Sequence, residues 1–264
     1  MYRHLRNIPF FSDFFRLVRA FLLSIKKPKI NDLGFYINGN KDQAKGKYEI
    51  QVASYLEANL FKYDRIINIG ANIGYWPLFL RNLKFTGQID AIEPDYFNFH
   101  QLRKNIASND FTVNTLNVAV SNTETNMTLY GFGTGISKLK GWAGGYSKRK
   151  QNVSCIKLDD LFVNQFKRTL LIVDVEGAEL DVLTSGKNFL QSDSEILVEI
   201  SLSEHVPNGI KLNPTFLDTF KLLWEYGYSS FTWCDDFTLL DENKISKIMD
   251  AEIIPTIQMY CFKK

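Results

Sequence analysis

Three short segments of the chain are apolar on both faces: residues 65–69, 169–175 and 195–200. Segments with the apolar spacing of a helix alternate with them along the chain. Strands that are buried on both faces and separated by helices form a parallel sheet that helices cover on both sides. The sequence therefore predicts an α/β fold built on a doubly wound, mostly parallel sheet.

The other elements follow from the same patterns. Helical spacing predicts helices at residues 48–60, 75–83, 96–107, 178–190 and 215–226, and apolar runs predict further strands at 88–92, 115–120, 228–233 and 256–262. We find no helical pattern between the last two strands. Strands joined without a crossover pair antiparallel, so we expect the sheet to end in an antiparallel pair.

The charge of the chain is unevenly distributed. Residues 1–30 carry a net charge of +6, and the rest of the chain carries −4. The body is therefore not a polyanion binder, and we expect no nucleic-acid partner. The three cysteines, Cys155, Cys234 and Cys261, lack zinc-ligand spacing, and we expect free thiols in a reducing, cytoplasmic compartment.

Residues 7–25 have the spacing of an amphipathic helix, rich in Phe and flanked by Lys and Arg. Arginines interrupt its apolar run, which is shorter than the roughly 20 residues that are needed to cross a bilayer. For the same reason we do not expect a secretory signal peptide here. The helix either packs on the core or on a second subunit, which we favour, or lies on the inner membrane surface as a peripheral contact. We accordingly divide the chain into residues 1–45, this helix and its connector, and residues 46–264, the main domain.

The most informative segment is residues 66–76, IINIGANIGYW, in which a strand runs through a glycine loop into a helix. Gly70 permits a sharp turn, and Gly74 lets the helix start approach a ligand closely. The G-x-x-x-G spacing differs from the G-x-G-x-x-G of dinucleotide-binding folds. An NAD-dependent oxidoreductase is therefore the weaker alternative.

The next predicted strand ends at Glu93, 23 residues after Gly70. A carboxylate at this position can accept hydrogen bonds from both hydroxyls of a ribose. The alternative is that Glu93 caps a helix that begins at Pro94. The glycine loop before it makes ribose binding the favoured interpretation.

These segments carry a family resemblance. Over about residues 48–264 the chain resembles the FkbM-type methyltransferases, through INIGANIG, AIEPDYFNFHQLRKNI, LNVAVSN, IVDVEGAELDVLTSG and ILVEI. The resemblance implies the Rossmann-like fold of class I methyltransferases, with a seven-stranded sheet that ends in an antiparallel pair. It also implies S-adenosylmethionine as methyl donor and O-methylation of a hydroxyl, often on a carbohydrate or glycolipid.

The resemblance further implies roles for single residues. Gly70, Asn72 and Gly74 would surround the methionine part of the donor, Glu93 would hold the ribose, and Asn117 and Ala119 would lie near the adenine. The full implied donor site is Asn68, Gly70, Ala71, Asn72, Gly74, Glu93, Asn117, Ala119 and Asp174. Two positions depart from the family pattern: Asn68 replaces the usual acid before G-A-N, and Ile172 replaces the usual lysine before D-x-E-G.

Four residues are candidates for the reaction centre: Asp174, Glu176, Glu199 and His205. A sugar hydroxyl needs a base to take its proton as the new bond forms. We expect Asp174 to face the junction of donor and acceptor and Glu176 to act as base or to orient the acceptor. Glu199 and the loop residue His205 rank behind them. We predict no metal, and we expect Glu179 to cap the following helix.

Residues 131–150 contain six of the 16 glycines, five basic residues and no acid. As a closing loop, this segment would offer aromatic rings to a sugar face and cations to a phosphate or uronate: Trp142 and Tyr146, and Lys138, Lys140, Lys148 or Arg149. It would then favour a glycan, nucleotide-sugar or glycolipid acceptor. The alternative for this segment is a solvated glycine-rich hairpin. For the whole protein, Asn68 and Ile172 suggest as an alternative a non-catalytic protein that binds glycan or membrane.

Overall fold

The computed structural model describes Val18 and residues 25–122, 125–131, 133, 136–140, 142, 149–161, 168–202, 213–232, 238–250 and 259–264. The predicted amphipathic helix at residues 7–25 lies almost wholly outside this part of the chain, as do His205, Tyr146, Lys148 and Cys234. Of the other cysteines, Cys155 and Cys261 are free thiols, as expected.

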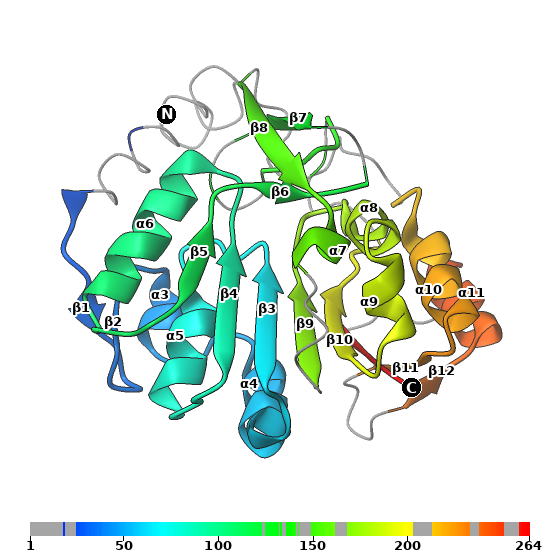
Figure 1. Cartoon of the computed structure of the whole chain (residues 1–264), viewed down its shortest axis with the longest axis horizontal. Helices are drawn as coiled ribbons and strands as arrows, with labels where there is room; N and C mark the ends of the chain where they lie inside the picture. Colours follow the sequence, from blue (N-terminus) through cyan, green and yellow to red (C-terminus); the bar gives the residue numbers. More distant parts are fainter. Residues whose placement is uncertain are drawn as a thin grey trace, which may run out of the picture.

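One large sheet organises the fold (Figure 1). Its strands, in sheet order, are β12 (Leu239–Leu240), β11 (Ser229–Thr232), β13 (Met259–Lys263), β10 (Glu195–Glu199), β9 (Thr169–Val173), β3 (Arg65–Ile69), β4 (Gln88–Ile92) and β5 (Asn114–Leu116). The strands β10, β9, β3, β4 and β5 are parallel, and β13 pairs antiparallel with both β10 and β11. The predicted parallel sheet with an antiparallel end is therefore confirmed, with eight strands rather than seven because β12 extends the edge.

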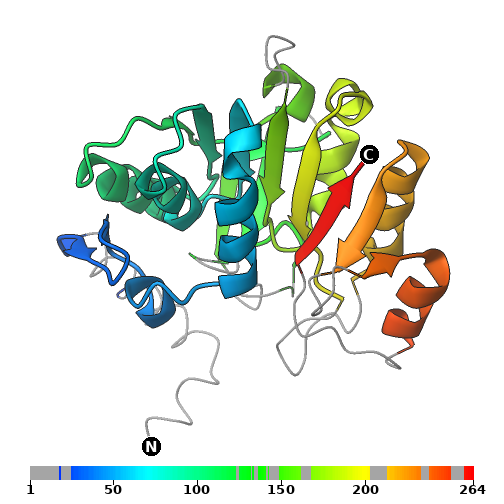
Figure 2. The ribbon, with the colours of Figure 1, turned by 90° about the horizontal axis from the view of Figure 1, so that it is seen from below.

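Helices cover both faces of this sheet (Figures 1 and 2). One face packs against α4 (Ile50–Asn59), α5 (Tyr75–Asn82) and α6 (Tyr96–Ala107). The other packs against α7 (Leu158–Leu161), α8 (Glu179–Thr184), α9 (Lys187–Gln191), α10 (Phe216–Glu225) and α11 (Glu242–Met249). Alternate residues of β3 enter the two cores, Ile66 the first and Ile67 the second, which is why apolar residues occupy both faces of this strand.

Three predictions about the elements were wrong: the extent of one strand, the continuity of one helix and the absence of another helix. The strand predicted at 115–120 is two strands, β5 and β6 (Ala119–Val120), which belong to different sheets. The helix predicted at 178–190 is interrupted before α9, where a Cβ on Gly186 would lie 2.5 Å from Leu158 Cδ2. A helix, α11, occupies the stretch between the last two predicted strands, which the sequence pattern did not show.

The connector before α4 is also more ordered than expected. It contains β1 (Lys29–Ile30), β2 (Tyr36–Ile37) and α3 (Lys41–Ala44), and a short 3-10 turn, η1 (Leu60–Lys62), follows α4. Phe35 and Ile37 are buried in the core beside α4 and α5. The connector therefore contributes to the packed core.

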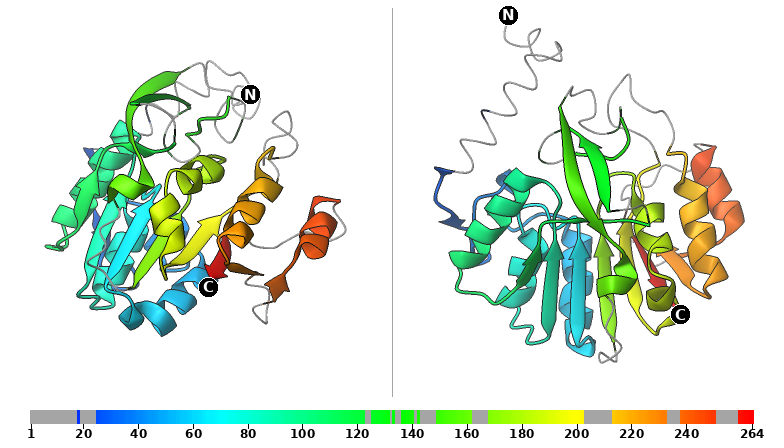
Figure 3. Two further views of the ribbon diagram at one scale, coloured as in Figure 1. Left: turned by 45° about the vertical axis from the view of Figure 1, so that its right-hand side comes forward. Right: turned by 45° about the horizontal axis from the view of Figure 1, so that its top comes forward.

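A small three-stranded sheet lies beyond the carboxyl ends of the parallel strands (Figures 1 and 3). It consists of β6, β8 (Lys150–Ile156) and β7 (Asn126–Tyr130), in that order. The chain enters it after β5 and leaves it before β9, so it is an insertion within one crossover connection. No helix among the described residues is long and apolar enough to cross a membrane.

Candidate functional site

The glycine loop after β3 is fixed against the end of β9. Gly70 has a φ of +79°, and a Cβ at this position would lie 1.7 Å from the carbonyl oxygen of Asp174. The backbone N–H of Asp174 in turn donates to the carbonyl of Ile69 at 3.0 Å. Only glycine fits this contact, which places the loop and Asp174 side by side.

The other small residues of the loop pack against the elements around it. Gly74 also has a positive φ, +90°, and a Cβ there would lie 2.5 Å from Leu102 Cδ1 of α6. Ala71 is buried, and its backbone N–H donates to the carbonyl of Ile92 at 2.9 Å. Gly74 therefore allows α5 and α6 to pack closely, a role different from the close approach to a ligand that the sequence suggested.

Glu93 is held at the mouth of this loop. Its carboxylate accepts hydrogen bonds from the backbone N–H of Asn72 at 2.8 Å and of Asp95 at 2.9 Å. Burial, and next the charge of Asp95, raise the pKa of Glu93 to about 7. The N-terminal cap of α6 is Asp95, which accepts from the backbone N–H of Asn98 at 2.9 Å. Glu93 is therefore free of the capping role that was its alternative.

A pocket of about 670 Å³, including its open mouth, extends from Glu93 along the strand ends. Gly70, Asn72, Glu93, Ala119, Asp174 and Glu176 all line it. Its apolar wall comes from the small sheet and from residues next to its strands: Val118, Ala119, Val120, Met127, Leu129 and Ile136. An apolar wall facing a few convergent polar groups is typical of a small-molecule site.

Four of the predicted donor-site residues lie outside the pocket lining. Asn117 is exposed, and its Nδ2 donates to the carbonyls of Glu93 and Pro94 at 2.8 and 3.1 Å. It thus positions the backbone at Glu93. Gly74 and Ala71 act through packing, as described above, while Asn68 is buried in β3 with its Oδ1 accepting no hydrogen bond from the part of the chain that the structure describes.

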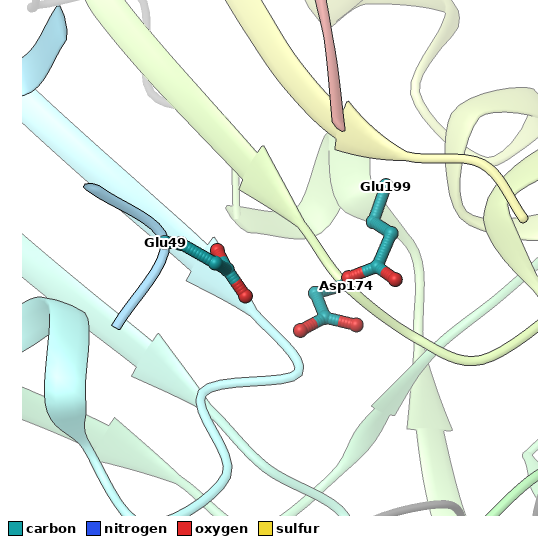
Figure 4. A group of neighbouring side chains, drawn as sticks. All are labelled: Glu49, Asp174 and Glu199. Carbon is teal, nitrogen blue, oxygen red and sulfur yellow. The ribbon is translucent and has the colours of Figure 1, made fainter. Parts of the chain in front are cut away.

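Asp174 and Glu199 meet a third acid that sequence reasoning missed, Glu49 (Figure 4). One carboxylate oxygen from each of the three lies within 4.8 Å of the other two. Glu49 precedes α4 in a left-handed conformation, with a φ of 42°. It lies 125 residues before Asp174 in a segment without an acidic motif, so only the fold reveals the group.

Burial and mutual repulsion raise the pKa values of these acids. The pKa of Asp174 lies well above its usual value because of burial first, then the charges of Glu199 and Glu176. The pKa of Glu199 rises to about 8, through burial and then the charge of Glu49, although a hydrogen bond with Asp174 partly offsets the rise. Burial also raises the pKa of Glu49. All three carboxyl groups therefore release their protons less readily than isolated acids do.

Glu176 and Glu179 have separate places. Glu176 lines the pocket in a left-handed conformation, with a φ of 54°, and its carbonyl accepts from Ser137 Oγ at 2.6 Å. Glu179 is buried at the start of α8, and its Oε1 accepts from the backbone N–H of Gly177 at 2.7 Å. This contact is with the turn before the helix. The N-cap of α8 is Ala178, and no side-chain cap hydrogen bond from the described residues is found there, so the expected capping role of Glu179 is wrong.

The glycine-rich segment contributes differently from the expectation. Trp142 is 1% exposed and packs near Gly177, so its ring is not presented to a sugar. Lys138 lines the pocket and forms an ion pair with Asp181. Lys140 is exposed, and Arg149 lies over the Phe97 ring at 5.0 Å from its centroid.

The pocket residues fit the donor that the resemblance implies. Glu93 offers carboxylate oxygens for ribose hydroxyls, and the apolar wall suits an adenine ring. Asn72, which lines the pocket, has an Oδ1 that is buried and accepts no hydrogen bond from the described residues. A buried polar atom of this kind calls for a ligand partner.

Two methyltransferases are among the solved structures to which this chain is similar, both at low sequence identity. Precorrin-6y C5,15-methyltransferase from Geobacter metallireducens GS-15 is 14% identical, with 90% of this chain and 98% of that chain covered and a TM-score of 0.46. Magnesium protoporphyrin IX methyltransferase (ChlM) from Synechocystis PCC 6803, with bound S-adenosylmethionine, is 8% identical, with 95% and 91% covered and a TM-score of 0.44. These values carry no argument about the substrate, and a search of curated proteins found no match.

The family comparison is more specific. The model of the methyltransferase FkbM domain matches residues 68–230, which include the glycine loop, Glu93 and the acids from Asp174 to Glu199. The resemblance found in the sequence is thereby confirmed. The chain belongs to the FkbM methyltransferase family and is an S-adenosylmethionine-dependent methyltransferase with the class I fold.

Proposed function

We propose that the protein transfers the donor methyl group to a hydroxyl of a carbohydrate or glycolipid. The observation that carries this proposal is the wall of carboxylates at the pocket, where Asp174 and Glu176 lie together beside the loop at Gly70. A neutral hydroxyl becomes a good nucleophile only when a base takes its proton. A carboxylate beside other acids is a stronger base than an isolated one, since repulsion disfavours its charge.

Each residue has a task in this mechanism. S-adenosylmethionine, when bound, supplies an electrophilic methyl group on a sulfonium. Glu93 holds the ribose, and the turn at Gly70 keeps the donor beside Asp174. Glu176 orients the acceptor hydroxyl and takes its proton, while Asp174 lies at the junction of donor and acceptor. Because the leaving group is already good, alignment of the two substrates provides much of the rate.

The acceptor that we propose is a glycan, a nucleotide-sugar or a glycolipid. Lys138 supports an anionic acceptor, because it lines the pocket and carries a positive charge beside Asp181. We further propose that the basic N-terminal residues bring the enzyme to the inner membrane surface when the acceptor is lipid-linked.

The first test separates donor binding from chemistry. Glu93→Ala should weaken binding of S-adenosylhomocysteine by about 1.5–3 kcal/mol through loss of charge-assisted hydrogen bonds, measured by calorimetry. Glu176→Gln should bind it as the wild type does but transfer labelled methyl to glycan and glycolipid extracts at least about 100-fold more slowly.

The outcomes distinguish the alternatives. Binding of S-adenosylhomocysteine without methyl transfer to any extract would favour a non-catalytic protein. Methyl appearing only on nitrogen or carbon would reject the hydroxyl acceptor. Binding of NAD with no binding of S-adenosylhomocysteine would favour an oxidoreductase.

A further inference from the structure

Three acids from separate parts of the fold converge at the carboxyl edge of the sheet (Figure 4). Glu49 comes from the start of α4, Asp174 follows β9, and Glu199 ends β10. No ion pair among the described residues involves any of the three. The described residues therefore place three carboxyl groups together here without a cation paired to any of them.

Two buried acceptor atoms around this group lack a hydrogen-bond partner among the described residues. Glu49 Oε2 is one of them, although the Tyr48 side chain bonds the same carboxylate. The other is Oδ1 of Asn68, a residue only 1% exposed. Asn68 pairs in register with Ile172, and strand alternation places its side chain on the same face of the sheet as Asp174. Buried acceptors without partners point to a ligand that donates hydrogen bonds.

We infer that Glu49, Asp174 and Glu199 form a cation-binding site, and that its ligand is the α-ammonium group of the methyl donor. This inference rests on the donor of the proposed function, and it assigns a ligand contact to Glu49. Asp174 belongs both to the pocket lining and to the acid group, so the acid group lies next to the donor pocket.

The geometry suits an ammonium group. It carries three N–H donors, one for each carboxylate. Three acceptors at about 2.9 Å from one tetrahedral nitrogen lie roughly 4.7 Å apart, and the three carboxylate oxygens lie within 4.8 Å of one another. A divalent metal also prefers oxygen ligands, so the test below includes metal binding as an outcome that overturns the inference.

The test uses two donor analogues and calorimetry on the full chain. S-adenosylhomocysteine contains the ammonium group, and 5′-methylthioadenosine lacks the whole amino-acid part. Glu49→Gln should weaken binding of S-adenosylhomocysteine by about tenfold to 100-fold, the loss typical of a charge-assisted hydrogen bond. Binding of 5′-methylthioadenosine should change less than about twofold. Glu57→Gln, an exposed acid of the same helix, should leave both affinities unchanged.

Other results would overturn the inference. An equal loss for both analogues would make Glu49 a structural residue, and no loss for either would remove it from the site. If Mg²⁺ or Mn²⁺ alone raises the melting temperature of the wild type but not of Glu49→Gln, the site binds a metal. If the wild type binds neither analogue, the donor assignment itself fails, which is distinct from a failure confined to Glu49→Gln.

Discussion

Asn68 and Ile172 are two departures from the family pattern that the fold brings into contact. They occupy neighbouring strands and face each other in register, Asn68 on β3 and Ile172 on β9. The resemblance implies an acid and a lysine at these positions, which would pair across the strands. Here both are neutral, and each is no more than 1% exposed. The two changes therefore act as one replacement that leaves no unpaired charge in the core.

This pairing predicts the effect of restoring one charge. Asn68→Asp should lower the free energy of unfolding by about 3 kcal/mol, because an unpaired carboxylate would be buried below Asp174 and Glu199. Adding Ile172→Lys should recover part of that loss. Urea denaturation of the single and double variants measures both effects; a single variant as stable as the wild type would contradict the argument.

At the scale of elements, the sequence was sufficient to predict the bounds of a helix or strand when all its apolar residues follow one period. The bounds of β3, β4 and α6 match the prediction because their apolar residues follow one strand or helix period. The strand predicted at 115–120 divides because Asn117 bonds the carbonyls of Glu93 and Pro94, after which β6 pairs with β8. These are tertiary contacts, and a local sequence pattern does not predict them.

The same limit applies to the candidate site. Gly70, Glu93 and Asp174 lie at strand ends with recognisable motifs, and they were predicted from the sequence. Glu49 joins them only because α4 packs across the sheet beside α5. The helix α11 was missed because Ile245 and Ile248 are its only buried residues. Two buried residues are too few to establish a helical period in the sequence.

The contact between the glycine loop and β9 predicts a difference between two glycines. Gly34 and Gly70 both have a positive φ, but a Cβ on Gly34 meets nothing within 4 Å. Gly34→Ala should therefore cost only the left-handed strain, about 1 kcal/mol. Gly70→Ala should cost more and should also abolish binding of S-adenosylhomocysteine, because the loop must move away from Asp174. Thermal unfolding measures the two stability losses, and calorimetry measures the binding of S-adenosylhomocysteine. Equal stability losses for Gly34→Ala and Gly70→Ala would contradict this contact.

At the scale of the whole molecule, several buried acids favour a stability that depends on pH. The pKa values of Glu93 and Glu179 rise to about 7 and that of Glu199 to about 8, all chiefly through burial. A raised pKa in the folded state means that the folded protein retains protons which the unfolded chain releases near pH 4.5. This contribution is complete below the unfolded value and is lost as the pH rises through the folded value.

We therefore expect the free energy of unfolding of the ligand-free protein to fall between pH 5 and about pH 8. Glu199→Gln should flatten the upper part of this decline, whereas the exposed Glu57→Gln should leave the profile unchanged. Urea unfolding at several pH values measures the slope. A profile of Glu199→Gln parallel to that of the wild type would remove Glu199 from the effect.

The small sheet that forms one wall of the donor pocket is inserted within a single connection, between β5 and β9. The connection runs from β5, at one edge of the main sheet, to β9, which lies beyond β4 and β3, and the pairing of these strands does not depend on its length. Changes of length or sequence in the insertion can therefore alter this wall of the pocket while Gly70, Glu93 and Asp174 keep their places at the strand ends.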